Sequence, residues 1–129
     1  MSYITGIGGI FVKSKDGEKL KKWYKKHLTM PVDEYGARFK LRDHANPEKE
    51  GYAVWGIFKD DSEYFDPSKK DFMINFRVSD LDGLLKKLKS EGIEQVGKMA
   101  EYDFGRFAWI IDPEGTKIEL WEPAGGIPD

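Results

Sequence analysis

Hydrophobic and polar positions change their period along the chain, and the same change occurs in both halves. In each half, a run of apolar residues precedes a segment in which leucine and aromatic side chains recur every three or four positions. The first pattern is typical of a β-strand and the second of an amphipathic helix. Further short apolar runs follow each helix, which predicts β-α-β-β-β twice. The expected strands are Ile4–Val12, Val32–Tyr35, Arg38–Arg42, Tyr52–Phe58, Phe72–Val78, Gln95–Lys98, Arg106–Ile111 and Thr116–Glu122.

The two expected helices carry recognisable start and stop signals. Asp16 can cap the first helix, and Met30–Pro31 should end it, because a residue before proline is pushed out of the helical region. Ser79 or Asp80 can cap the second helix, and Gly92 suits the position after its last turn. Both helices should bury an apolar stripe. The stripes are Leu20, Trp23, Tyr24, His27 and Leu28 in the first helix, and Leu81, Leu84, Leu85 and Leu88 in the second.

The length and the repeated pattern indicate one domain with an internal duplication. A chain of 129 residues suits a single core. The polar segment Asp60–Lys70 separates the halves, whose elements superpose at an offset of about 64 residues. We therefore expect one domain, residues 1–129, built from a first module at 4–59 and a second at 71–123. The tail from Ala124 onward is expected to be loose.

The last two expected strands form the firmest local prediction. Proline at the second position and glycine at the last position of Asp112–Gly115 are typical of a tight turn. A hairpin over Phe104–Pro123 follows. Because side chains alternate along a strand, Glu119 and Trp121 should lie side by side on one face of a curved sheet.

The same alternation assigns side chains to the face of the sheet that no helix covers. That face combines aromatic rings with a few polar groups, as the lining of a small-molecule pocket does. A second small core or a dimer interface would look the same in sequence. Arg106, at the start of a strand, is a further candidate for holding an anionic group, although a surface ion pair is the more common role. The predicted lining residues are Phe11, Phe58, Asn75, Arg77, Glu119 and Trp121.

Composition and charge exclude several kinds of function. The formal net charge is −2, with both signs spread along the chain, which argues against a nucleic-acid partner. The chain contains no cysteine, so disulfides, thiolate metal sites and a cysteine nucleophile are excluded. No apolar stretch has the length of a membrane span and no signal peptide is evident, so we expect a cytoplasmic protein without a membrane partner.

Two β-α-β-β-β units and the closing hairpin resemble the vicinal-oxygen-chelate superfamily, which includes glyoxalase I, bleomycin-resistance proteins and extradiol dioxygenases. The resemblance covers essentially the whole chain. It implies an α+β fold in which two βαβββ modules form a cupped mixed sheet. The segments that carry it are Phe104–Gly115 (FGRFAWIIDPEG), Lys117–Leu120 (KIEL), Lys22–Leu28 (KWYKKHL) followed by Met30–Pro31, and Val78–Asp82 (VSDLD).

In metal-dependent members, four strand residues, each histidine, glutamate or glutamine, bind one divalent ion. Carried over to this chain, those positions fall on Gly9, Gly56 (or Trp55), Met73 and Glu119. Only Glu119 can bind such a cation, and one carboxylate does not make a metal site. The two histidines, His27 on the first helix and His44 in a loop, do not replace the missing ligands.

The resemblance and these departures leave three hypotheses. The first is a metal-free protein of the bleomycin-resistance type that binds a small organic molecule in an aromatic cup, as a homodimer and without a cofactor. The alternative is a divalent-metal-dependent lyase, isomerase or dioxygenase, similar to lactoylglutathione lyase, with Glu119 as ligand and base. The third is metal-free catalysis with Glu119 as the catalytic base and Arg77 or Arg106 holding an anionic substrate. Whether the protein is an enzyme stays open at this stage.

Overall fold

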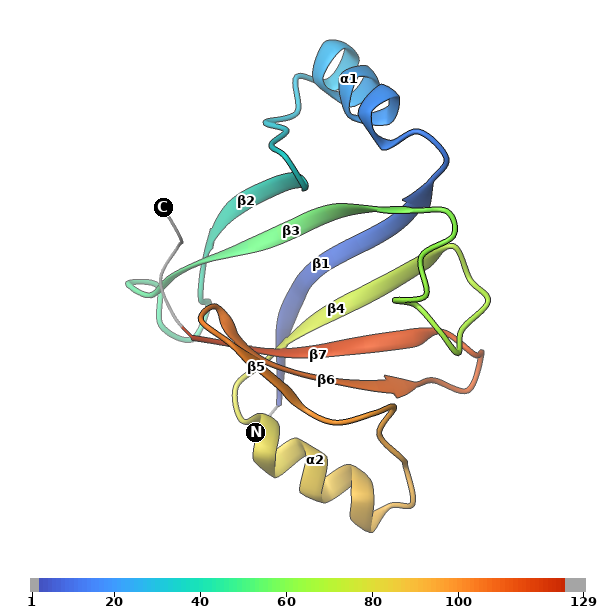
Figure 1. Cartoon of the computed structure of the whole chain (residues 1–129). Coiled ribbons are helices and arrows are strands. Elements are labelled where there is room, and N and C mark those ends of the chain that lie inside the picture. Colours follow the sequence, from blue (N-terminus) through green and yellow to red (C-terminus); the bar gives the residue numbers. More distant parts are fainter. Residues whose placement is uncertain (1–2, 125–129) are drawn as a thin grey trace.

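The computed structural model describes residues 3–124 and contains one mixed sheet with two helices (Figure 1). The sheet has seven strands in the order β2-β3-β1-β4-β7-β6-β5 and curves into a cup. The predicted loose tail, apart from Ala124, lies outside the described residues. The elements are β1 Ile4–Ser14, α1 Gly17–Leu28, β2 Gly36–Arg42, β3 Glu50–Lys59, β4 Phe72–Val78, α2 Leu81–Ser90, β5 Ala100–Tyr102, β6 Gly105–Ile111 and β7 Lys117–Pro123.

The two halves of the chain join along their first strands. β1 pairs with β4 in antiparallel fashion, with Ile10 opposite Ile74. Within each half the first strand runs parallel to the last one, β1 beside β3 and β4 beside β7. The predicted α+β class and cupped mixed sheet are therefore confirmed, and the two halves contribute the two sides of one cup.

The predicted closing hairpin is confirmed. β6 and β7 pair antiparallel, with Trp109 opposite Glu119. In the turn, the Asp112 side chain accepts hydrogen bonds from the backbone N–H groups of Glu114 and Thr116. Gly115 has a φ of +81°, a left-handed conformation that glycine adopts without a steric penalty. The turn therefore fixes the register that places Glu119 and Trp121 on the concave side.

Two predicted strands are wrong. Val32–Tyr35 forms only an isolated bridge from Val32 to Ala37, because the Asp33 carboxylate accepts from the backbone N–H groups of Tyr35 and Gly36 and closes a turn there. Gln95–Lys98 is irregular, and the strand in this part of the chain is β5. Gly97, with a φ of +73°, interrupts the extended backbone just before it. The first half therefore has three strands and the second half four.

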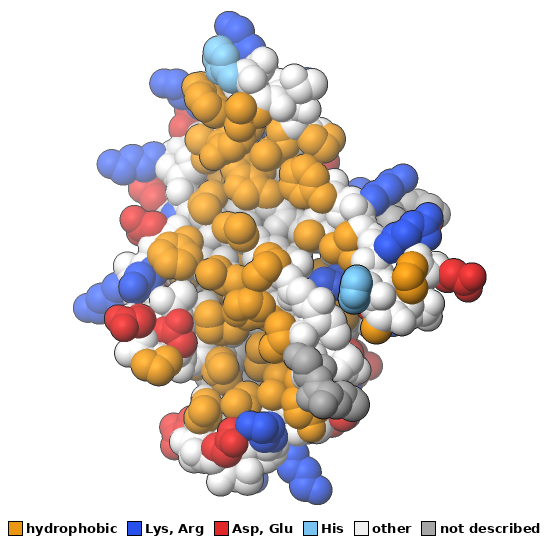
Figure 2. All heavy atoms as spheres, turned by 180° about the vertical axis from the view of Figure 1, so that it is seen from behind, with side chains coloured by type: hydrophobic (Ala, Val, Ile, Leu, Met, Phe, Trp, Pro, Cys, Tyr) orange, Lys and Arg blue, Asp and Glu red, His pale blue; other side chains and the backbone are white. Residues whose placement is uncertain are grey.

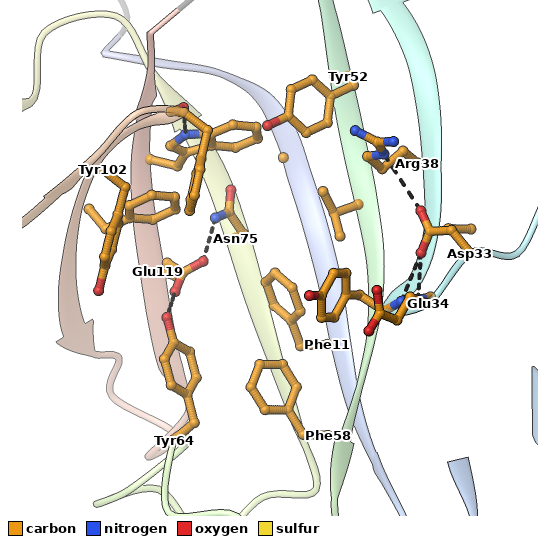
Figure 3. Close-up of a pocket in the computed structure, with 18 residues that line it drawn as sticks. Phe11, Asp33, Glu34, Arg38, Tyr52, Phe58, Tyr64, Asn75, Tyr102 and Glu119 are labelled. Atoms are coloured by element: carbon orange, nitrogen blue, oxygen red, sulfur yellow. Dashed lines mark hydrogen bonds and ion pairs between the residues drawn. The ribbon is translucent and has the colours of Figure 1, made fainter. Parts of the chain in front are cut away.

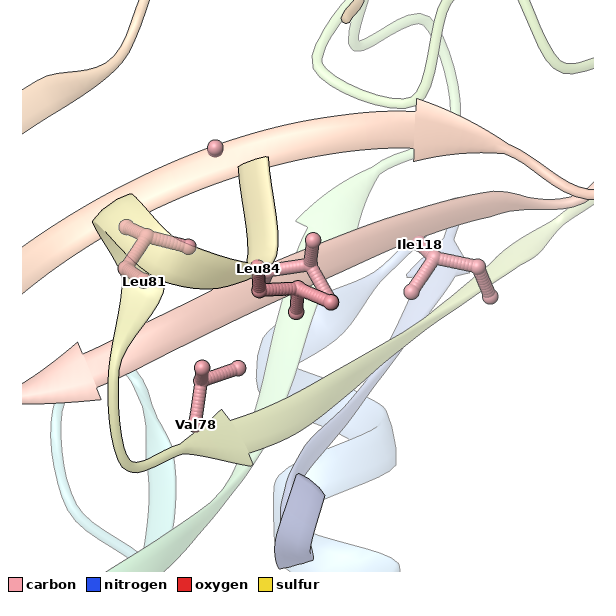
Figure 4. Close-up of a cluster of buried hydrophobic side chains, with 6 residues drawn as sticks. Val78, Leu81, Leu84 and Ile118 are labelled. Atoms are coloured by element: carbon pink, nitrogen blue, oxygen red, sulfur yellow. The ribbon is translucent and has the colours of Figure 1, made fainter. Parts of the chain in front are cut away.

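The second helix packs as its pattern predicts. Asp80 caps α2 by accepting from the backbone N–H of Gly83, and Gly92 follows the helix with a φ of +81°. Leu81 and Leu84 are buried against Val78 and Ile118 on the outer face of the sheet (Figure 4). This cluster is the main aliphatic core, and it holds the hairpin rigidly against β4.

The first helix does not pack as predicted. Asp16 caps α1 as expected, but no residue of α1 is buried. Tyr24 contacts Trp55 with ring centroids 4.4 Å apart, whereas Trp23 is 50% exposed and Leu28 57% exposed. The helix stands at the edge of the sheet (Figure 1) and leaves the outer face of β1 uncovered. Ile10, expected to meet this helix, is 47% exposed.

An apolar surface follows from this placement. Seen from behind the cup, hydrophobic side chains extend from α1 across the sheet towards α2 (Figure 2). Ile10 and Phe72 are exposed members of this surface, opposite in parity to the inward-facing Phe11 and Met73. Ile7 joins them because the register shift between Ile7 and Gly9 reverses the alternation there. Among residues 3–124, no helix is long and apolar enough to cross a membrane.

Leu81→Ala should lower the free energy of unfolding by about 2–5 kcal/mol, because it leaves a cavity beneath α2 at a fully buried position. Lys86→Ala, at an exposed position of the same helix, should change it by less than about 0.5 kcal/mol. Urea denaturation followed by circular dichroism measures both values. Equal effects of the two substitutions would contradict the packing of α2.

Candidate ligand-binding site

The concave side of the sheet encloses a cavity of about 690 Å³. That volume lies in the range of cavities that hold small organic molecules. Half of the residues that line it are aromatic, and they come from both halves of the cup (Figure 3). Aromatic residues of the lining include Phe11, Tyr52, Phe58, Tyr64, Phe107 and Trp121.

Five of the predicted lining residues meet on this wall. Phe11 comes from β1, Phe58 from β3, Asn75 from β4, and Glu119 and Trp121 from β7. Asn75 stands directly opposite Glu119 in the parallel ladder of β4 and β7. Strand alternation placed these side chains on one face, and the curvature of the sheet turns that face into a concave wall.

Glu119 is the polar centre of the wall. It is 2% exposed, and its carboxylate accepts three hydrogen bonds. Asn75 Nδ2 donates to Oε1 at 2.7 Å, while the Tyr64 hydroxyl and Trp109 Nε1 donate to Oε2 at 2.6 and 2.8 Å. A buried carboxylate needs such partners because it has lost its hydration. The network therefore fixes the orientation of Glu119 between three elements of the structure.

Tyr64 brings the segment between β3 and β4 over the cavity. Its carbonyl accepts a 2.7 Å hydrogen bond from Lys117 Nζ, which also lies 5.4 Å from the Tyr64 ring. Burial raises the pKa of the Tyr64 hydroxyl, and the neighbouring Glu119 carboxylate adds a smaller increase. The hydroxyl therefore stays protonated and is a donor at neutral pH. Burial also lowers the pKa of Lys117, and Glu119 partly opposes that shift.

Glycines on the central strands make room for the wall. A Cβ atom at Gly56 would lie 2.6 Å from the Phe11 ring, and one at Gly8 would overlap Asn75 Oδ1. The ladder of β1 shifts register between Ile7 and Gly9, which brings Gly8 to the concave side. These positions stay without side chains because rings and an amide fill the space.

Two predicted residues lie outside the cavity. Arg77 lies next to Trp121, its neighbour in the β4–β7 ladder, with its Cζ atom 5.3 Å from that ring, and donates to the Tyr52 carbonyl at 2.8 Å. Burial lowers the pKa of Arg77. Arg106 pairs with Glu122 at 2.9 Å and Asp82 at 3.1 Å beside the start of α2. Both guanidinium groups are therefore engaged by other parts of the protein. Neither arginine is among the residues that line the cavity.

Several residues that line the cavity were not predicted from the sequence. Tyr52 and Phe107 face inward on strands where both parities are apolar, so alternation did not distinguish them. Tyr102 belongs to β5, and Phe104 lies in the turn after it. The sequence placed the strand of this region at Gln95–Lys98 instead. Asp33, Glu34 and Arg38 line the rim because the turn before β2 folds towards the cavity. An aromatic cluster at Tyr102–Phe107 was the one available signal.

Comparison with known proteins identifies the fold. No protein-family model matches the chain, and no curated protein matches it. A methylmalonyl-CoA epimerase from Streptomyces coelicolor, solved in complex with 2-nitronate-propionyl-CoA, superposes with a TM-score of 0.69 and 17% identity over 97% of this chain and 99% of that one. The methylmalonyl-CoA epimerase from Mycobacterium tuberculosis gives a TM-score of 0.62 and 23% identity over 96% and 91% of the two chains. The fold is that of the vicinal-oxygen-chelate superfamily.

The Mn(II)-bound glyoxalase from Novosphingobium aromaticivorans has the same vicinal-oxygen-chelate fold. It superposes with a TM-score of 0.60 and 18% identity over 100% of this chain, which spans 42% of that longer chain. Sequence identities of 17–23% show a shared fold only. The chemistry of the cavity has to be deduced from the residues of this chain.

The residues at the metal positions of the vicinal-oxygen-chelate fold do not fit a divalent ion. Gly9 and Gly56 offer no side-chain donor, and the fully buried thioether of Met73 is a poor ligand for Mn²⁺ or Zn²⁺. Glu119 already accepts three hydrogen bonds from the protein. Within the described part of the chain, no three histidine, cysteine, aspartate or glutamate side chains gather as a metal site would require.

Glu119→Gln should lower the free energy of unfolding by about 1–3 kcal/mol, because an amide cannot accept all three hydrogen bonds and turns its NH₂ group towards a donor. Glu114→Gln, in the exposed turn between β6 and β7, is the matched control and should have almost no effect. Thermal and urea unfolding measure the difference. A neutral effect of Glu119→Gln would mean that the carboxylate is not held as described.

Proposed function

We propose that this protein binds a small organic molecule in the aromatic cavity and does so without a metal ion. The observation that carries the proposal is the cavity of about 690 Å³, walled by aromatic rings around one buried, hydrogen-bonded carboxylate. Aromatic walls supply most of the binding free energy of such sites through buried apolar area, and a few polar groups orient the ligand.

Glu119 serves in this proposal as a polar anchor rather than as a catalytic base. A base must reach the proton that it removes, at hydrogen-bond distance from the substrate. Both oxygens of Glu119 already accept hydrogen bonds from Tyr64, Asn75 and Trp109, and its side chain is almost completely buried. These contacts favour a rigid wall over proton transfer, so we propose binding without turnover.

The metal-dependent alternative would need Glu119 as both ligand and base. The donor set at the other three positions, Gly9, Gly56 and Met73, supports no such role. A lyase, isomerase or dioxygenase reaction through a divalent ion is therefore not proposed for this chain.

Thermal unfolding in the presence of small aromatic compounds tests the proposed function. A compound that binds the folded state alone, at 100 times its dissociation constant, stabilises it by about 2.7 kcal/mol and raises the melting temperature by several degrees. We expect such shifts with aromatic compounds, and we expect no ion-specific shift with Mn²⁺, Zn²⁺ or Ni²⁺.

A variant that fills the cavity provides the control for this experiment. Val54→Trp, on the concave face of β3, should remove the response to aromatic compounds while the fold persists in circular dichroism. Purified protein with one bound metal ion per chain, or equal responses of the variant and the wild type, would contradict the proposal.

We also propose that the protein forms a homodimer through the apolar outer surface. One chain carries both an α1 helix none of whose residues is buried and a β1 strand whose outer face lacks a helix. A two-fold axis would bring α1 of one copy against β1 of the other, and the same contact would repeat in reverse. Trp23 and Ile10, each about half exposed, would then be covered.

Ile10→Glu should convert the dimer to a monomer, because it places a charge at the centre of the apolar surface. Light scattering after size exclusion measures the mass. Ile93→Glu, at an exposed position beyond the end of α2, is the control and should leave the dimer intact. A monomeric wild-type protein would overturn the proposed dimer and leave the ligand-binding proposal untouched.

A further inference from the structure

The charged residues that line the cavity have an excess of negative charge. Three carboxylates, those of Asp33, Glu34 and Glu119, face one guanidinium, that of Arg38. Arg38 pairs with Asp33, its nitrogen 3.5 Å from Oδ2. The lining therefore keeps two carboxylates beyond this pair. Lys117, outside the lining, interacts with Glu119 and offsets part of its charge, so the repulsion of an anionic ligand comes mainly from Glu34 at the rim.

The two remaining carboxylates differ in how they are satisfied. Glu119 is buried and accepts three hydrogen bonds. Glu34 is exposed at the rim, and within residues 3–124 its carboxylate makes no hydrogen bond or ion pair. Lys21 donates only to the backbone carbonyl of Glu34 and pairs with Glu18. Glu34 is thus the charge that a ligand can meet directly.

Figure 3 shows how these groups face one another. Glu34 and Glu119 lie on opposite sides of the cavity, with the Phe11 ring between them and the Phe58 ring next to Phe11. These two rings pack edge to face, with centroids 5.7 Å apart. A ligand resting on them would therefore have a carboxylate on either side.

Ring faces of the same wall already attract cations from the protein. The Arg77 guanidinium lies 5.3 Å from the centre of the Trp121 ring, and Lys117 Nζ lies 5.4 Å from that of Tyr64. Neither cation is among the residues that line the cavity. An aromatic ring attracts a cation to its face through its quadrupole, so ring faces of the wall that stay open to the cavity favour a cation.

The hydrogen-bonding groups of the wall show the same preference. The indole N–H groups of Trp109 and Trp121 already donate to Glu119 and to the Phe104 carbonyl. Among the described residues, the buried side-chain atom without a hydrogen-bond partner is an acceptor, Asn75 Oδ1. The wall therefore has acceptors and ring faces to offer, and few N–H donors.

We infer that the ligand is an organic cation, an ammonium or protonated amine on an apolar or aromatic body. The body would lie on Phe11 and Phe58, and the charge would face Glu34, with Glu119 on the far side. This inference rests on the proposed binding function and adds the charge class of the ligand. An aromatic box closed by carboxylates is a known chemical solution for recognising alkylammonium groups.

Three probes that share a phenol ring can separate charge from shape. They are (4-hydroxyphenyl)trimethylammonium, its neutral isostere 4-tert-butylphenol, and the anion 4-hydroxybenzenesulfonate. Calorimetry measures their dissociation constants, and tryptophan fluorescence gives a second readout. We expect the cation to bind about tenfold more tightly than the neutral isostere, and the anion not to bind. Added salt should reduce this preference, because the rim is exposed to solvent.

Glu34→Gln removes the charge at the rim and keeps the shape of the side chain. It should weaken the cation about three- to tenfold and leave the neutral isostere unchanged, since the fold does not depend on an exposed, unpaired carboxylate. Glu94→Gln, exposed in the segment after α2, is the matched control and should change neither value.

The outcomes distinguish this inference from the proposed function. Equal binding of the cation and the neutral isostere would overturn the inference and leave small-molecule binding intact. Tighter binding of the anion, or an unchanged cation affinity in Glu34→Gln, would overturn it as well. Failure of all three probes to bind would count against the proposed function itself.

Discussion

A carboxylate buried away from water must be satisfied by the protein, and this requirement at Glu119 determines much of the structure around it. Its three donors come from separate places: Asn75 on β4, Trp109 on β6 and Tyr64 in the segment between β3 and β4. The cost of leaving such a group unpaired is several kcal/mol. The network therefore links the two strands beside β7 and ties a long connection down over the cavity.

Two glycines shape the aromatic wall as strongly as the hydrogen bonds of Glu119 do. Gly56 leaves room for the Phe11 ring, and Gly8 leaves room for Asn75, which then reaches Glu119. A divalent ion in this cup would need ligands that project from such strand positions. Here the same space holds rings and an amide, so the one carboxylate accepts hydrogen bonds where it could otherwise have bound an ion. The aromatic wall and the unsuitable donor set thus have a common structural origin.

The sequence predicted the fold wherever local pattern and turn chemistry agreed. The hairpin that carries Glu119 and the stripe at Leu81 and Leu84 were predicted from turn residues and spacing, and the helix cap was narrowed to Ser79 or Asp80, of which Asp80 is the cap. The prediction was wrong where a side chain takes the hydrogen bonds that a strand would need. The Asp33 carboxylate accepts from backbone N–H groups and closes a turn in place of the expected strand. Such competition depends on geometry that hydrophobic periodicity does not record.

The site was predictable only in part, for a related reason. Alternation gives the face of a residue, but it does not give the partner that meets it across the cup. Arg77 and Asn75 share a face of β4, yet one lies next to Trp121 and the other joins Glu119. The negative rim was also hidden, because Glu34 reaches the cavity through the turn that replaces a predicted strand. The charge of the lining follows from curvature and turns together, which is why the net charge of the chain says little about the ligand.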